Sequence, residues 1–193
     1  MEVTDRQEKI DKVIVNRREG VVVLQDIHDP HNAAAVWRSA DAMGLQKIYL
    51  IFEKEKEFNP KKMGRESSAS ANKWLDFKIF KSTKECFDEL HKDGYEIFAT
   101  VLDKEARTVG SVDMASQKKV AVVMGNEHRG LTEEATNLAD KKIYIPMRGM
   151  VQSLNLSVSA AICLYEIERQ RNINGGDFGL NVDEKKDLER RWR

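Results

Sequence analysis

The chain of 193 residues is long enough for one domain with a sizeable hydrophobic core, and its 41% hydrophobic and 33% charged residues are typical of a soluble globular protein. Its 32 Lys and Arg residues balance its 32 Asp and Glu residues, so composition alone does not indicate a nucleic-acid partner. No apolar run reaches the roughly 18 residues of a membrane-spanning helix, and the charged N-terminus lacks the apolar core of a signal peptide.

Short helical extensions are expected at both ends of the chain, over residues 1–20 and 172–193. In the first, Thr4 and Gln7 have the spacing of a capping box, and Gly20 is placed to end the helix. The second has a glycine-containing hinge and then a short charged helix that ends in Trp192.

The main body, expected over residues 21–171, alternates between strand-like and helix-like segments. Short apolar segments predict six strands, at residues 21–27, 47–52, 74–80, 95–102, 118–125 and 141–147. Helices are predicted over 32–44 with Asn32 as cap, 83–94 with Thr83 as cap, 131–139 with Thr132 as cap, and 153–171. This order predicts an α/β fold with a mostly parallel sheet and helices on both faces.

Three of the strand ends have unusual sequences, and ligands of parallel sheets bind at the carboxyl ends of strands. The first is "DIHDPHNAAAVWRSADAMG", in which Arg38 follows Asn32 by six residues, roughly 9 Å along a helix axis. The long Arg38 side chain is able to reach back toward the loop or forward into a neighbouring subunit. The alternative is that Asn32 only caps the helix and Arg38 is a surface cation.

The second strand end is "VVMGNEHRGLTEEA", in which Gly125 and Gly130 bracket a tight loop. Glycine permits the backbone to approach a ligand closely, and Asn126 and Glu127 are expected at the rim of this loop. The loop is not a phosphate-binding P-loop, because the Lys-Ser/Thr pair is missing.

The third strand end, "IPMRGMVQSLN", leads into the closing helix, whose first turns carry Ser153 and Asn155. Serine at a helix start is an expected cap, whereas Asn155 one step inside is not needed for capping and is a mediocre helix former. Together with the free N–H groups of a helix start, these residues predict a polar pocket. Caps and a solvated helix face are the alternative.

Several site classes are disfavoured. No G-x-G-x-x-G sequence follows a strand, and the glycine-rich motif of Rossmann-type methyltransferases is missing too. His28 and His31 are three residues apart, but the other histidines are distant and the two cysteines, Cys86 and Cys163, are isolated, so we expect no metal site. Ser153 lacks the G-x-S-x-G context of an acyl-transfer nucleophile. A cytoplasmic protein with two reduced thiols is expected.

In this order, "HNAAAVWRSADAMGL", "VVMGNEHRGLTEEA" and "IYIPMRGMVQSLNLSVSAAICLYE" resemble the three signature motifs of the SpoU/TrmH family of SPOUT RNA 2′-O-methyltransferases. The resemblance spans residues 21–168. It implies a deep trefoil knot in the C-terminal half, which general topology rules would disfavour. It also implies a homodimer that binds S-adenosylmethionine in the knot. The short extensions look most like the branch of the family that methylates guanosine 18 of tRNA.

The resemblance also implies roles for individual residues. The functional residues of the three motifs would be Asn32, Arg38, Glu127, Ser153 and Asn155. Donor contacts would come mainly from the backbone of three loops, at Thr100, Val101, Leu102, Gly125, Asn126, Ile145, Pro146, Met147, Met150, Ser153 and Leu154.

The implied reaction is in-line attack of a ribose 2′-oxygen on a sulfonium methyl group, with loss of the hydroxyl proton. Arg38 would act as an unusual base assisted by a phosphate, or would stabilise the developing alkoxide while another group takes the proton. We favour the second role, because a guanidinium rarely gives up its proton. Ser153 and Asn155 would fix Arg38 and the ribose, and Asn32 and Glu127 would hold that geometry.

Local basic residues are able to bind tRNA even though the net charge is zero. The main candidates are Arg17, Arg18, Arg169 and Arg171; further candidates are Lys61, Lys62, Arg65, Arg190, Arg191 and Arg193. Trp192 would stack on a base or, as we favour, pin the tail to the body. Another RNA substrate, such as ribosomal RNA or a different tRNA nucleotide, and an RNA-binding protein without catalysis are the alternatives.

Overall fold

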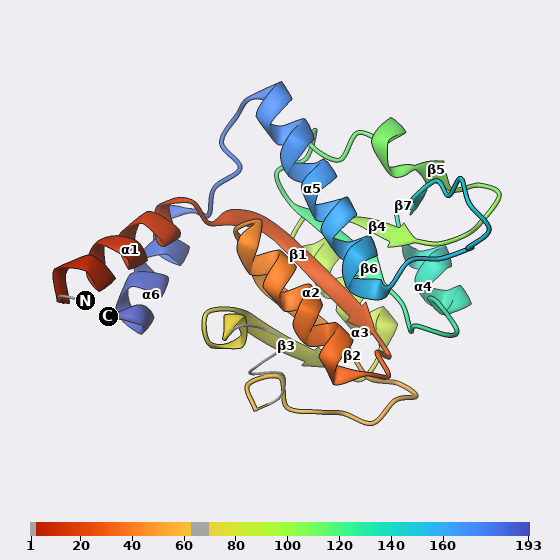
Figure 1. Cartoon of the computed structure of the whole chain (residues 1–193), viewed down its shortest axis with the longest axis horizontal. Helices are drawn as coiled ribbons and strands as arrows, with labels where there is room; N and C mark the ends of the chain where they lie inside the picture. Colours follow the sequence, from red (N-terminus) through yellow and green to blue (C-terminus); the bar gives the residue numbers. More distant parts are fainter. Residues whose placement is uncertain (1–2, 63–69) are drawn as a thin grey trace.

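The computed structural model describes residues 3–62 and 70–193, so Arg65 lies outside the described residues, and so does the side chain of Thr4. Seven parallel strands form one sheet in the order β3-β2-β1-β6-β4-β7-β5 (Figure 1). They are β1 (Arg18–Gln25), β2 (Leu45–Ile51), β3 (Asp76–Phe80), β4 (Glu96–Thr100), β5 (Arg107–Thr108), β6 (Val120–Met124) and β7 (Lys141–Tyr144). The predicted α/β fold is therefore confirmed.

Six α-helices accompany the sheet within the described part of the chain: α1 (Val3–Val15), α2 (Pro30–Ala42), α3 (Thr83–Lys92), α4 (Glu133–Leu138), α5 (Leu156–Asn174) and α6 (Val182–Trp192). Two 3₁₀ turns, Ala71–Lys73 and Val109–Ser111, lie in the connections. None of the helices among the described residues has the length and apolar character needed to cross a bilayer.

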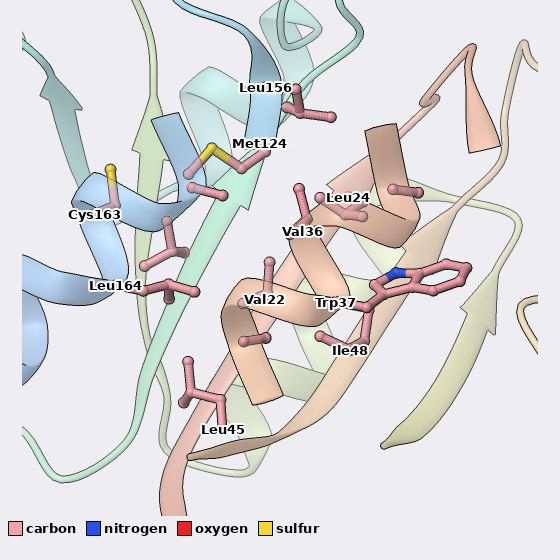
Figure 2. Close-up of a cluster of buried hydrophobic side chains, with 14 of the residues drawn as sticks. Val22, Leu24, Val36, Trp37, Leu45, Ile48, Met124, Leu156, Cys163 and Leu164 are labelled. Carbon is pink, nitrogen blue, oxygen red and sulfur yellow. The ribbon is translucent and has the colours of Figure 1, made fainter. Parts of the chain in front are cut away.

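Alternation of side chains along β1 divides the hydrophobic core into two layers. Val22 and Leu24 face α2 and α5, in the layer that Figure 2 shows around Trp37. Val21 and Val23 face the other way, into the layer formed with α3 and α4. Because both faces of the sheet are covered, β6 is apolar throughout and β1 is apolar from Val21 to Leu24, as is usual for parallel sheets.

The strand order brings the three unusual sequences to one edge. Strands β1, β6, β4 and β7 are neighbours and parallel, so the loops that follow them leave from the same side of the sheet. The chain runs outward from β1 to β3 and then resumes at β4 on the far side of β6, which makes the region around β1 and β6 a topological switch point. Such points are the usual ligand sites of open α/β sheets.

The predicted capping residues of three helices were wrong. Helix α2 is capped by Asp29, which accepts a hydrogen bond from the His31 N–H at 2.8 Å, so Asn32 lies inside the first turn. Helix α5 is capped by Asn155, so the helix begins after Ser153. Helix α3 is capped by Ser82 rather than by Thr83. Only the cap of α4, Thr132, is confirmed among the capping side chains of the main-body helices.

The predicted end of the first helix, at Gly20, was also wrong. Helix α1 ends at Val15, and Gly20 lies within β1. The reason is that pairing of β1 with β2 already begins between Arg18 and Leu45, which draws the chain into the sheet.

Ile10 and Ile14 of α1 pack on Leu188 of α6 and on Leu180, which lies just before α6. Trp192 lies against this cluster, with its ring 5.2 Å from that of Trp74. Trp192 therefore pins the tail to the body, the role favoured from the sequence.

Replacing Leu188 by alanine should cost about 3 kcal/mol of unfolding free energy, because it leaves a cavity in this small cluster. Urea denaturation of the full chain measures this loss. Lys186→Ala on the exposed face of the same helix is the control, and a similar loss in both variants would contradict the packing role of Leu188.

Candidate active site

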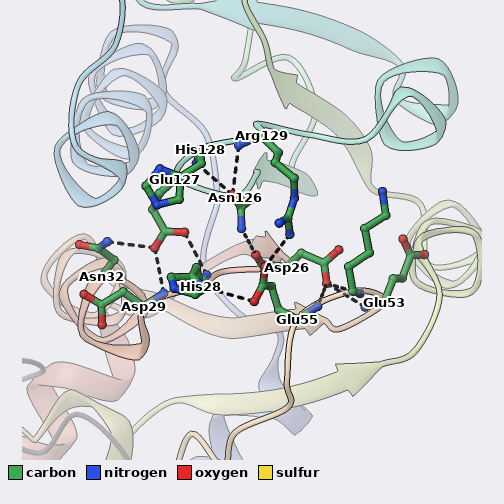
Figure 3. A network of polar contacts seen from close by, with 11 residues as sticks. Asp26, His28, Asp29, Asn32, Glu53, Glu55, Asn126, Glu127, His128 and Arg129 are labelled. Carbon is green, nitrogen blue, oxygen red and sulfur yellow. Dashed lines mark hydrogen bonds and ion pairs between the residues drawn. The ribbon is translucent and has the colours of Figure 1, made fainter.

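The carboxylate of Glu127 lies against the start of α2 (Figure 3). It accepts hydrogen bonds from the backbone N–H of His28 at 3.0 Å and of Asp29 at 3.2 Å, and from Asn32 Nδ2 at 2.9 Å. The N–H groups and dipole at a helix start favour an anion there. Glu127 thus joins the second unusual loop to the first.

Glu127 is ionised at neutral pH. Its burial disfavours the charged form, but the hydrogen bonds from Asn32 and from the His28 backbone outweigh burial, so the pKa of Glu127 is lowered from its ordinary value of 4.5. An ionised carboxylate only accepts hydrogen bonds. The Glu127 carboxylate therefore accepts a hydrogen bond from the side-chain NH₂ of Asn32, and the side-chain carbonyl oxygen of Asn32 points away from Glu127.

That carbonyl oxygen meets the third motif. Asn155 Nδ2 donates to Asn32 Oδ1 at 3.2 Å, while Asn155 Oδ1 accepts from the backbone N–H of Ser157 at 2.9 Å and from its hydroxyl at 2.7 Å. One chain of hydrogen bonds, Glu127–Asn32–Asn155, thus connects all three motifs. The sequence predicted a polar pocket here but missed that Asn155 is also the cap.

Asn126 was expected at the rim, but it is buried and holds the loop from within. Its Nδ2 donates to the Asp26 carbonyl at 2.7 Å, and its Oδ1 accepts from the N–H groups of His128 and Arg129. At Gly125 a Cβ would lie 2.3 Å from the backbone of Gly130, so only glycine fits. The backbone at Gly125 packs directly against that of Gly130, which closes the loop.

Arg38 is not part of the hydrogen-bond chain. It is exposed on α2, and no hydrogen bond or ion pair involves it within the described residues. Six residues correspond to about 600° of helical rotation, so Arg38 and Asn32 project about 120° apart around the axis. Ser153 is also exposed, just before α5, and makes no hydrogen bond within the described part of the chain.

Residues 19–165 match the SpoU rRNA Methylase family. The chain belongs to the SpoU methylase family. It is 38% identical over 170 residues to the tRNA (guanosine(18)-2'-O)-methyltransferase of Thermus thermophilus, an alignment that covers 86% of this chain and 83% of the relative. The Escherichia coli K12 enzyme of the same name is 33% identical, with 88% and 72% covered.

Solved structures agree. The TrmH/SpoU tRNA modifying enzyme of A. aeolicus superimposes with a TM-score of 0.84 at 31% identity, over 98% of this chain and 95% of that one. The SpoU methyltransferase AviRb from Streptomyces viridochromogenes in complex with AdoMet gives 0.70 at 27% identity, over 86% and 65%.

Two of the four arginines expected to bind RNA are buried in this SpoU methylase. Arg17 is 1% exposed and pairs with Asp41 at 2.6 Å. Arg171 is 3% exposed and donates to backbone carbonyls of β1 and of the segment before β6. Their guanidinium groups are tied into the fold, so they are not available to a phosphate.

The other two arginines remain accessible. Arg18 and Arg169 line a cavity of about 770 Å³ between α1 and the ends of α2 and α5, together with Lys9, Lys12 and Tyr165. Asp41 and Glu168 also line this cavity, so basic side chains outnumber acidic ones in its wall.

Most of the further basic candidates have partners within the protein. Lys61 donates to the Leu75 carbonyl at 2.7 Å, Arg191 forms a two-pronged pair with Asp76, and Arg193 pairs with Asp11. Lys62 and Arg190 are exposed, and Arg190 pairs with Asp187 of its own helix.

The loops expected to bind the methyl donor lie side by side in this SpoU methylase, since they follow the neighbouring strands β4, β6 and β7. The Thr100 hydroxyl donates to the Val123 carbonyl at 2.8 Å, and the Val101 N–H donates to the Ile143 carbonyl at 2.9 Å, which fixes the end of β4 between the other two. Beyond these anchors, Leu102 and Met150 are 70% and 101% exposed. Large exposed apolar side chains at a strand edge indicate a binding surface.

Proposed function

We propose that this chain transfers a methyl group from S-adenosylmethionine to the 2′-oxygen of a ribose in tRNA, with guanosine 18 as the position. The observation that carries the proposal is the hydrogen-bond chain Glu127–Asn32–Asn155, which links three distant sequence segments at the ligand-binding edge of the sheet. The identity with tRNA (guanosine(18)-2'-O)-methyltransferases over most of the chain supports the substrate. We propose that the enzyme acts in the cytoplasm.

The loops after β4, β6 and β7 fit such a donor. Leu102 and Met150 offer apolar surface for an adenine, and the backbone of residues 100–102, 125, 145–147 and 150–154 offers polar groups. When bound there, S-adenosylmethionine supplies an electrophilic methyl group. The deep knot implied by the family would enclose these loops.

Arg38 stabilises the developing negative charge on the ribose oxygen in this proposal. A fixed cation next to a developing alkoxide lowers the barrier, whereas a guanidinium holds its proton firmly and is therefore a poor base. The proton then passes to water or to a phosphate of the RNA. Asn155 and Ser153 orient the ribose, and Glu127 holds Asn32 so that Asn155 keeps its position.

Because Arg38 projects away from its own hydrogen-bond chain, we propose that it serves the site of a second copy in a homodimer. Beside it, α2 and α5 form an open groove lined mostly by small and apolar side chains, at Ala35, Ser39, Met43, Ser157, Val158, Ala161, Ile162 and Tyr165. Val158 and Tyr165 are 45% and 59% exposed there. Packing of two such grooves together would cover this surface and carry Arg38 across the interface.

Position mapping tests the function. An unmodified tRNA transcript is incubated with methyl-labelled S-adenosylmethionine, and the modified nucleotide is identified by nuclease digestion. We expect 2′-O-methylguanosine at position 18 and no transfer to a transcript with 2′-deoxyguanosine there.

Other results would replace the proposal. Methylation at another nucleotide or only on ribosomal RNA would change the substrate. RNA binding without transfer, and without calorimetric binding of S-adenosylmethionine, would make the protein a non-catalytic RNA-binding protein.

A further inference from the structure

Glu55, outside the three motifs, connects the two loops that hold Glu127. Its Oε1 accepts from Arg129 Nη2 at 2.6 Å, and its Oε2 pairs with His28 Nδ1 at 3.1 Å (Figure 3). The carboxylate is only 18% exposed, whereas Arg129 and His28 are 52% and 64% exposed. Glu55 is therefore the inner partner on which two outer side chains converge.

The backbone around Glu55 is fixed. The buried carboxylate of Asp26 accepts hydrogen bonds from the N–H groups of residues 53, 54 and 55 at 2.8, 2.9 and 3.1 Å. The backbone carbonyl of Asp26 also accepts a hydrogen bond from Asn126 Nδ2. The Glu55 side chain thus projects from a turn that is anchored to the end of β1.

Both partners of Glu55 lie next to Glu127 in the hydrogen-bond network. The backbone N–H of His28 donates to the Glu127 carboxylate, and Arg129 is two residues after Glu127 in the closed loop 125–130. The segments that follow β1, β2 and β6 are therefore connected through the Glu55 carboxylate.

We propose that Glu55 is a positioning residue for methyl transfer, acting through His28 and Arg129 to hold Glu127 and hence Asn32 and Asn155. The proposal rests on the function proposed above. Hydrogen bonds from Arg129 and then from His28 lower the pKa of Glu55 from its ordinary value of 4.5, so the carboxylate stays charged at neutral pH.

The Glu55→Gln variant tests the proposal, since it keeps the side-chain size but removes the charge and half of the accepting capacity. We expect kcat to fall about tenfold, as small misplacements of reacting groups cost such factors. The KM values for tRNA and S-adenosylmethionine and the melting temperature should stay unchanged. Amide hydrogen exchange in a peptide covering residues 125–130 should become faster.

The matched control is Glu57→Gln. Glu57 belongs to the same loop and pairs with exposed Lys81, outside the network, so the same loss of charge should leave kcat and exchange unchanged. Arg129→Lys should lose less activity than Arg129→Gln. Glu55→Gln combined with Arg129→Gln should cost less than the product of the two single effects, because the residues act together.

A wild-type kcat for Glu55→Gln, or a lower melting temperature that accounts for the loss, would overturn the proposal. So would tighter tRNA binding without a kcat effect, since that is the result expected of a carboxylate that merely repels phosphates. If the wild-type protein methylates no RNA, the proposed function fails instead. Unchanged exchange of loop 125–130 in Glu55→Gln would then refute the coupling independently.

Discussion

Replacing Arg38 by alanine should reduce methyl transfer by a factor on the order of 10³, the upper range for removal of one group that stabilises transition-state charge. The fold should be unaffected, with a change in unfolding free energy below about 0.5 kcal/mol, because Arg38 is exposed and has no partner within the described residues. Single-turnover methylation of tRNA and urea denaturation measure the two quantities. Lys84→Ala, an exposed cation on α3, is the control.

Mixed dimers distinguish the two possible locations of Arg38. If it crosses the interface, co-refolding equal amounts of Arg38→Ala and Asn155→Ala chains restores one intact site in each heterodimer, about a quarter of wild-type activity for random pairing in a symmetric dimer. If Arg38 acts within its own chain, every site lacks one group and no activity returns. That second result would refute the proposed interface role.

The sequence predicted the architecture and the meeting of the three loops because both depend on strong local signals. Alternation of apolar segments specified a parallel sheet, and the carboxyl ends of parallel strands share an edge. Contact between Glu127, Asn32 and Asn155 follows from that placement. The two-residue strand β5 was missed because it is too short to have a periodic pattern.

Helix caps could not be assigned because neighbouring residues compete for the same position. Asp29 and Asn32 are both good caps, as are Ser153 and Asn155, and tertiary contacts decide between them. Since Asp29 caps α2, the amide of Asn32 is left for Glu127 and Asn155. Two of the three cap errors, those of α2 and α5, therefore fall at the residues that form the site.

The burial of Arg17 and Arg171 could not be predicted from the sequence either, because the segments "NRREG" and "ERQR" have the composition of exposed, charged surface. Arg169 and Arg171 are two residues apart on α5, yet they face different surroundings. The Arg171 guanidinium lies 4.9 Å from the Phe178 ring centroid and donates to the carbonyls of Glu19 at 2.8 Å and Lys118 at 3.0 Å. Arg169 pairs with Glu166 of its own helix and is 43% exposed.

Arg171→Leu should therefore cost about 3 kcal/mol of unfolding free energy, because it removes the donor from the buried hydrogen bond to the Glu19 carbonyl and the part-buried one to the Lys118 carbonyl, and it leaves Glu168 without its nearest partner. That is a large part of the roughly 5–15 kcal/mol typical of a domain. Urea denaturation is the measurement, and tRNA affinity of the remaining folded protein should match wild type.

Arg169→Leu should give the opposite result. An exposed pair within one helix contributes well under 1 kcal/mol, so stability should be nearly unchanged. Its tRNA dissociation constant should rise several-fold, and the dependence of binding on salt should become shallower by about one phosphate contact, measured by filter binding between roughly 50 and 200 mM salt.

If Arg171→Leu instead weakened tRNA binding without loss of stability, the buried side chain would have to turn outward when RNA binds. Arg171 would then be an RNA contact after all, as the sequence suggested, despite its burial in the free protein.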